Sequence, residues 1–133
     1  MVRYLAESEH YKITSESEIV ILHFKKSDRK DIWIGDFYGD PTSAVITYDE
    51  KFVIMGGYGL IIYKLEEPFT EFRYGQATHQ YKELFRSSDN VKWIDVLYQT
   101  DKDETRDFFR MVISENSDEV YRMNAQTYEI EKI

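Results

Sequence analysis

The stretch AVITYDEKFVIMGGYGLIIYKL, residues 44–65, decides the fold of this 133-residue chain. It contains three apolar runs, at residues 44–47, 52–55 and 60–65, which are rich in the β-branched and aromatic side chains that favour strands. Polar residues 48–51 separate the first two runs, and Gly56-Gly57-Tyr58-Gly59 separates the second from the third. Because glycine tolerates the positive φ of tight corners, the stretch predicts three antiparallel strands joined by two hairpins.

Similar strand patterns continue in both directions along the chain. Short apolar or alternating runs predict strands at residues 11–13, 19–24 and 32–34, and again at residues 91–100, 108–114, 120–124 and 127–133. Between these parts, Ala77, Tyr81, Leu84 and Phe85 have the spacing of one helix face. The prediction is therefore an α+β fold, predominantly antiparallel β. It has one bent sheet or two packed sheets of about 7–9 strands, with one short helix near residues 77–86.

Two segments, residues 44–65 and 120–133, resemble the hairpins of propeller blades. A blade takes about 40–45 residues and a closed propeller needs at least four blades, so 133 residues are too few. We interpret the likeness as shared hairpin chemistry. The length is that of one domain, and we expect residues 1–133 to form a single unit.

Composition limits the classes of partner. The chain has 25 acidic and 17 basic side chains, a net charge of −8, and no cysteine. Such a charge repels phosphate backbones and anionic lipid headgroups, so we expect neither nucleic acid nor a membrane as partner. No apolar run approaches the roughly 20 residues of a membrane helix, and the N-terminus lacks the apolar region of a secretory signal. We expect a cytoplasmic protein.

No motif indicates catalysis. The three histidines, His10, His23 and His79, lie far apart in the chain and share no short metal-ligand spacing. Residues 56–59 lead into an apolar strand pattern, whereas a phosphate-binding glycine loop leads into a helix. No serine lies in a GxSxG motif. We therefore predict no catalytic, cofactor-binding or metal-binding residues and no enzyme activity.

Acidic and aromatic side chains gather in the predicted turns and indicate a surface that binds another molecule. Tyrosine and tryptophan are frequent energetic anchors of interfaces, and carboxylates around them select a basic partner. The alternative interpretation is that the aromatic side chains line the core and the acids keep the surface hydrated. The predicted partner-binding residues are Trp33, Asp36, Tyr38, Asp40, Asp49, Glu50 and Tyr58.

Two segments, GDFYGDP at residues 35–41 and ITYDEKFVIMGGYGLIIYKL at residues 46–65, resemble the immunity proteins of bacterial polymorphic toxin systems, including contact-dependent inhibition. This resemblance implies an inhibitor that binds a cognate, basic toxin domain such as a nuclease and occludes its active or substrate-binding site.

Two other functions remain open. One is a small-ligand or carbohydrate-binding β module that presents Trp33, Trp93 and tyrosines on one sheet face. The other is a homodimer that forms through an edge strand at residues 128–133.

Overall fold

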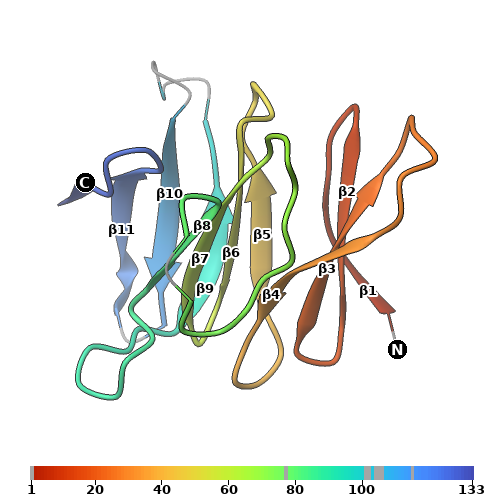
Figure 1. The fold of residues 1–133 in the computed structure, drawn as a ribbon. Coiled ribbons are helices and arrows are strands. Elements are labelled where there is room, and N and C mark those ends of the chain that lie inside the picture. Colours follow the sequence, from red (N-terminus) through yellow and green to blue (C-terminus); the bar gives the residue numbers. More distant parts are fainter. Residues whose placement is uncertain (1, 77, 101–102, 104–106, 115) are drawn as a thin grey trace.

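Twelve antiparallel strands form three four-stranded sheets in the computed structural model, which describes residues 2–76, 78–100, 103, 107–114 and 116–133 (Figure 1). Each sheet is built from four strands that follow one another in the chain. The first sheet contains β1 (Val2–Glu7), β2 (Tyr11–Glu16), β3 (Ile19–Phe24) and β4 (Ile32–Asp36). The second contains β5 (Ser43–Ile46), β6 (Phe52–Gly57), β7 (Gly59–Lys64) and β8 (Tyr81–Leu84). The third contains β9 (Ile94–Tyr98), β10 (Phe108–Ile113), β11 (Asn116–Asn124) and β12 (Ile130–Lys132).

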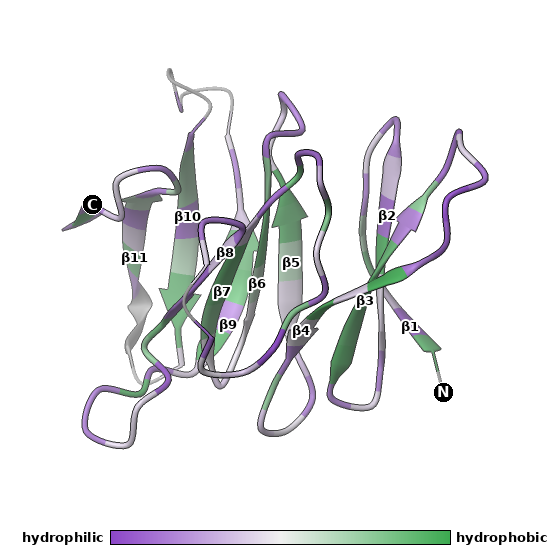
Figure 2. Ribbon diagram, in the orientation of Figure 1, coloured by the Kyte–Doolittle hydropathy of each residue, from purple (hydrophilic) through white to green (hydrophobic). Residues whose placement is uncertain are grey.

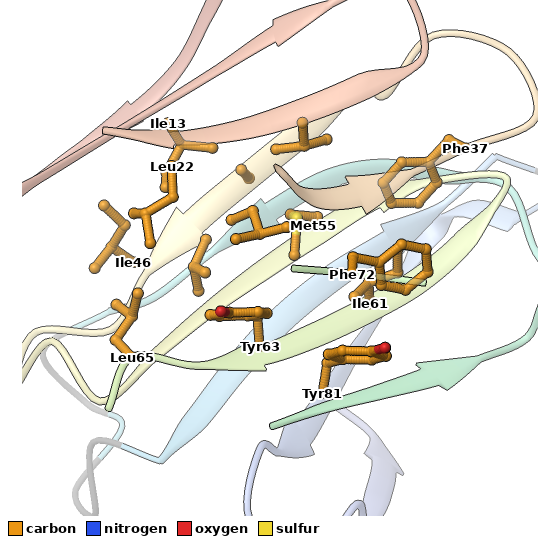
Figure 3. Packing of buried hydrophobic residues seen from close by; sticks show 14 residues of the cluster. Ile13, Leu22, Phe37, Ile46, Met55, Ile61, Tyr63, Leu65, Phe72 and Tyr81 are labelled. Carbon is orange, nitrogen blue, oxygen red and sulfur yellow. The ribbon is translucent and has the colours of Figure 1, made fainter. Parts of the chain in front are cut away.

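The second sheet lies between the other two and is covered on both faces. Side chains alternate across its strands: Val53 and Met55 join the core shared with the first sheet, whereas Phe52 and Ile54 join the core shared with the third. All residues of β6 are buried. This double burial explains why residues 52–55 and 60–63 are apolar without interruption. In Figure 2 the strands β6 and β7 of this sheet have the apolar colour, and Figure 3 shows Ile13 and Leu22 of the first sheet in the core above Met55 and Tyr63.

Each sheet is a meander of consecutive strands, which is also how a propeller blade is organised. The first strands of the three sheets are neighbours, since β5 lies against both β1 and β9. Each of the two buried clusters joins only adjacent sheets among the described residues. The sheets therefore form an open stack in chain order.

The structure confirms the predominance of antiparallel β and corrects the rest of the predicted fold. No helix exists in the described part of the chain, so none there could cross a membrane. The predicted helix near residues 77–86 is wrong: Ala77 lies outside the described residues, and β8 occupies part of the range. Tyr81 pairs with Tyr63 of β7, and their rings stack at a centroid distance of 6.2 Å. Tyr81 and Leu84 belong to different cores, so they do not share a helix face.

The predicted single bent sheet, or pair of sheets, of 7–9 strands is also wrong, because the described residues form three sheets and twelve strands. Two strands were missed, β1 and β8. A shift in the β1–β2 register between Tyr4 and Ala6 breaks the alternation that identifies a strand in sequence. In β8 the short polar segment Lys82–Glu83 conceals the pattern.

Candidate functional site

The candidate site lies at one end of the stack, where the β6–β7 hairpin turns at Tyr58. Successive connections in an antiparallel meander alternate between the two ends of the strands. The β2–β3, β4–β5, β6–β7 and β8–β9 connections therefore meet at this end, which we call the Tyr58 end, at the bottom of Figure 1. They contribute Glu18, the segment 37–42, Tyr58 and the segment 85–93.

Three aromatic rings from separate connections form a series at the Tyr58 end. The ring of Tyr58 meets that of Tyr38 edge-to-face at a centroid distance of 5.4 Å, and that of Trp93 at 4.8 Å. The backbone of Tyr58 also bridges to Trp93 in an antiparallel pair. Tyr38 is 74% exposed and Trp93 39% exposed, so the series offers apolar surface to a binding partner.

A hollow of about 460 Å³ opens beside this aromatic series. It is lined by aromatic side chains, two carboxylates, one guanidinium and two serines: Glu18, Asp36, Phe37, Tyr38, Tyr58, Tyr74, Arg86, Ser87 and Ser88. The volume falls within the roughly 300–1,000 Å³ range of small-ligand pockets. These residues come from five separate segments of the sequence, and only the fold brings the segments together.

Arg86 forms a fixed part of the wall. Its side chain is only 9% exposed, its Nε lies 3.0 Å from Glu83 Oε1, and its Nη2 donates a 2.7 Å hydrogen bond to the carbonyl oxygen of Asp36. The guanidinium also lies over the rings of Phe37, at 4.9 Å, and Tyr74, at 5.6 Å. Burial lowers the pKa of this guanidinium, against the opposing effect of Glu83.

The carboxylates are the accessible charges of the hollow. Glu18 and Asp36 are both exposed. The Oε2 atom of Glu18 accepts a 2.6 Å hydrogen bond from the Gly39 amide, which ties the β2–β3 turn to the β4–β5 connection. The Asp36 carboxylate makes no hydrogen bond or ion pair within the described ranges.

A second hollow of about 340 Å³ adjoins the first, because Asp36 and Tyr74 line both. Trp33, which is 55% exposed, lines this second hollow. The structure thus gathers four of the predicted partner-binding residues, Trp33, Asp36, Tyr38 and Tyr58, around two adjoining hollows.

The other three predicted residues lie elsewhere. Asp40 is exposed in the β4–β5 connection at the Tyr58 end but lines neither hollow. Asp49 and Glu50 lie in the β5–β6 connection, at the opposite end of the stack. Asp49 accepts hydrogen bonds from the Thr47 hydroxyl and the Lys51 amide within the turn.

The carboxylate of Glu50 is held by the β1–β2 turn. It accepts hydrogen bonds from the Ser8 hydroxyl and the His10 amide, and its Oε1 lies 2.7 Å from Nδ1 of His10. Burial alone would raise the pKa of Glu50, but these hydrogen bonds outweigh it and hold the pKa below its ordinary value. Glu50 therefore connects two turns of different sheets.

Glu18, Tyr74 and Arg86 were missed as site residues in the sequence. Each is ordinary in its local context. The strand order places Glu18 and Arg86 in connections that share the Tyr58 end, and Tyr74 reaches the hollow from the β7–β8 connection. Trp93 was considered only for a ligand-binding sheet face. Among the described residues, no group of three or more His, Asp or Glu side chains could hold a metal ion.

No protein-family model, curated protein or solved structure matches this chain. The fold and the site therefore define the class: an all-β protein of three stacked antiparallel sheets, with an aromatic and acidic surface at one end.

Proposed function

We propose that this protein is a cytoplasmic inhibitor of the toxin-immunity type, which binds a basic toxin domain such as a nuclease through the Tyr58 end and occludes its active or substrate-binding site. The observation that carries the proposal is the aromatic series of exposed Tyr38, half-buried Tyr58 and exposed Trp93 beside the accessible carboxylates of Glu18 and Asp36. The protein acts by binding and not by catalysis.

Physical chemistry supports this combination. Aromatic side chains bury a large area while few rotatable bonds are frozen, which slows dissociation. The net charge of −8 attracts a basic partner and speeds its association. Carboxylates can occupy the basic surface on which a nuclease holds phosphates.

Co-purification with the product of the neighbouring gene tests the proposal. We expect a complex that stays together on a sizing column and in which the toxin activity is lost. Separate elution of the two proteins, or a neighbour without toxic activity, would contradict it.

Variants then locate the interface. Reversing the charge of Asp36 and Asp40 together is expected to slow association, and the effect should weaken at high salt because it is electrostatic. The matched control reverses Asp28 and Glu129, two exposed carboxylates at the opposite end. Tyr58→Ala is expected to raise the dissociation rate about thirtyfold, as for the loss of an interface anchor of about 2 kcal/mol. Unchanged rates in both site variants would place the interface on another face.

The hollow itself favours a second candidate, a small-ligand or carbohydrate-binding module. Its concave, tyrosine-lined surface could hold the flat apolar face of a sugar. Titration with neutral oligosaccharides, followed by shifts of backbone amide resonances, separates the two: saturable shifts around Tyr38 and Tyr58 with no protein partner would favour the ligand module.

A further inference from the structure

We infer that the 460 Å³ hollow at the Tyr58 end is a receptor for a cationic side chain, specifically an arginine of the basic partner. The identity of the partner rests on the proposed function. The choice of a cationic side chain rests on the charges and aromatic rings of the hollow. It names the group that the partner inserts.

The balance of charge in the hollow is negative. Its lining holds one cation, Arg86, and two carboxylates, Glu18 and Asp36. The guanidinium of Arg86 is already compensated, since its Nε lies 3.0 Å from the carboxylate of Glu83. Asp36 also acts electrostatically on Arg86, but neither Glu18 nor Asp36 forms an ion pair among the described residues, so negative charge is in excess in the lining.

Accessibility excludes the opposite assignment, an anion bound to Arg86. The Nη1 atom of Arg86 has no hydrogen-bond partner among the described residues, but it is fully buried, as is Nε beside Glu83, and the whole side chain is only 9% exposed. An incoming anion cannot reach these atoms without first displacing the wall. It would instead meet the exposed carboxylates of Glu18 and Asp36, which repel it.

The aromatic lining suits a guanidinium in particular. Guanidinium is planar, stacks on aromatic faces, and donates up to five hydrogen bonds to carboxylates in a fixed fork. Tyr38 and Tyr58 contribute rings whose faces are not occupied by Arg86, whereas Phe37 and Tyr74 already have that guanidinium over them. An ammonium would make the same charge contacts but would not stack, so we expect arginine to bind more tightly than lysine.

Binding of a single amino acid derivative tests the proposed arginine receptor without any partner protein. The probe is N-acetyl-arginine amide, added to isotope-labelled protein while backbone amide resonances are recorded. We expect saturable shifts with a dissociation constant of about 1 mM, a weak but measurable affinity. The shifts should be largest near the hollow, including the Gly39 amide, which donates to Glu18. N-acetyl-citrulline amide has almost the same shape without the charge, and it should produce no saturable shifts.

A double variant, Glu18→Gln with Asp36→Asn, removes both charges while it keeps an acceptor oxygen for the Gly39 amide. We expect at least about tenfold weaker arginine binding, from the loss of charge-assisted hydrogen bonds. The matched control, Asp28→Asn with Glu129→Gln, makes the same change in net charge at the opposite end and should bind like the parent. An unchanged dispersion of the backbone amide resonances in each variant establishes that the fold is intact.

Each of the following results would overturn the inference: no saturable shift with arginine, equal shifts with citrulline, or equal affinity in the two double variants. Binding of acetate or phosphate at the same amides, in place of arginine, would also refute it. The proposed function fails separately. If the protein binds arginine but has no toxin partner, the arginine receptor is supported and the inhibitor function is contradicted. If it inhibits a toxin but does not bind arginine, the inhibitor function is supported and the arginine receptor is contradicted.

Discussion

Replacement of Gly59 by alanine is expected to destabilise the protein far more than the same change at Gly39. Both glycines have nearly the same left-handed backbone, with φ of +89° at Gly59 and +88° at Gly39. A side chain in that region costs about 1–2 kcal/mol at either position. The two sites share this backbone φ but differ in the space around the new Cβ atom, so the pair separates backbone strain from steric overlap.

At Gly59 the space is already filled. An added Cβ would lie 2.1 Å from Cγ of Arg86, 2.9 Å from the carbonyl oxygen of Phe85 and 3.0 Å from that of Leu84. Arg86 cannot swing away freely, because its guanidinium is held by Glu83 and by the carbonyl of Asp36. The two carbonyl oxygens belong to the end of β8 and the residue after it, and their movement would disturb the pairing of Leu84 with β7.

The magnitudes follow from these contacts. Overlap in a packed region adds about 1–3 kcal/mol to the backbone strain, so Gly59→Ala should cost about 2–5 kcal/mol in total. At Gly39 nothing lies within 4 Å of the added Cβ, so only the strain applies, about 1–2 kcal/mol.

Urea unfolding of both variants measures the two losses. We expect the midpoint to fall more for Gly59→Ala while the slope with denaturant stays constant, which indicates a change in stability alone. Gly75, with φ of +74° and nothing within 4 Å, is a second control that should behave like Gly39. Equal losses at all three glycines would refute the reasoning, because the close contacts of Gly59 would then cost nothing.

Three further outcomes are expected. Asp103→Ala should lower the free energy of unfolding by about 3 kcal/mol, the low end for a broken buried ion pair. The carboxylate of Asp103 is fully buried, but the guanidinium groups of Arg110 and Arg122 beside it keep some exposure to solvent. Urea unfolding measures the loss, and Asp28→Ala is the exposed control. Glu50 has a pKa below its ordinary value of 4.5, so it contributes stability above that pH and the contribution is lost on acidification through the lowered pKa. The unfolding free energies of the parent and Glu50→Gln should therefore converge in acid, and a constant difference would contradict the assignment. Burial raises the pKa of Tyr63 from 10.0 to about 12, so its contribution is complete below pH 10 and is lost as the pH rises towards 12. Tyr63→Phe should show a smaller loss of stability over that interval, and an equal loss would count against a buried phenol as its source.

The strands in the middle of the chain could be predicted because their apolar runs are uninterrupted. Residues 52–55 and 60–63 are apolar on both faces, and the structure covers both faces. The prediction of one bent sheet or two packed sheets leaves the second apolar face of these strands uncovered. A sheet with two apolar faces requires a layer on each side, and that alone indicates three layers.

Short strands with one polar segment could not be recognised in this way. In β8 only Tyr81 and Leu84 are apolar. Their separation of three residues fits one face of a helix, and it fits equally a strand that buries Tyr81 in one core and Leu84 in the other. Pairing with β7 decides between the two, since the Tyr63–Tyr81 stack and the Leu60–Leu84 pair exist only in an extended chain. That information is tertiary and is absent from a local window.

The position of the candidate site follows from counting connections. In a chain of consecutive antiparallel strands, every second connection returns to the same end of the stack. The connections that carry Glu18, Asp36 to Asp40 and Tyr58 are separated by even numbers of strands, so they lie at the same end, where Glu18, Asp36 and Tyr58 line one hollow, while Asp49 and Glu50 lie at the far end. The acids of the Tyr58 end are mostly left exposed beside aromatic rings, whereas those of the β5–β6 turn are engaged by Ser8, His10 and Thr47. The same acidic composition thus supports a binding surface at one end and turn structure at the other, and charge reversal at the two ends should separate these roles.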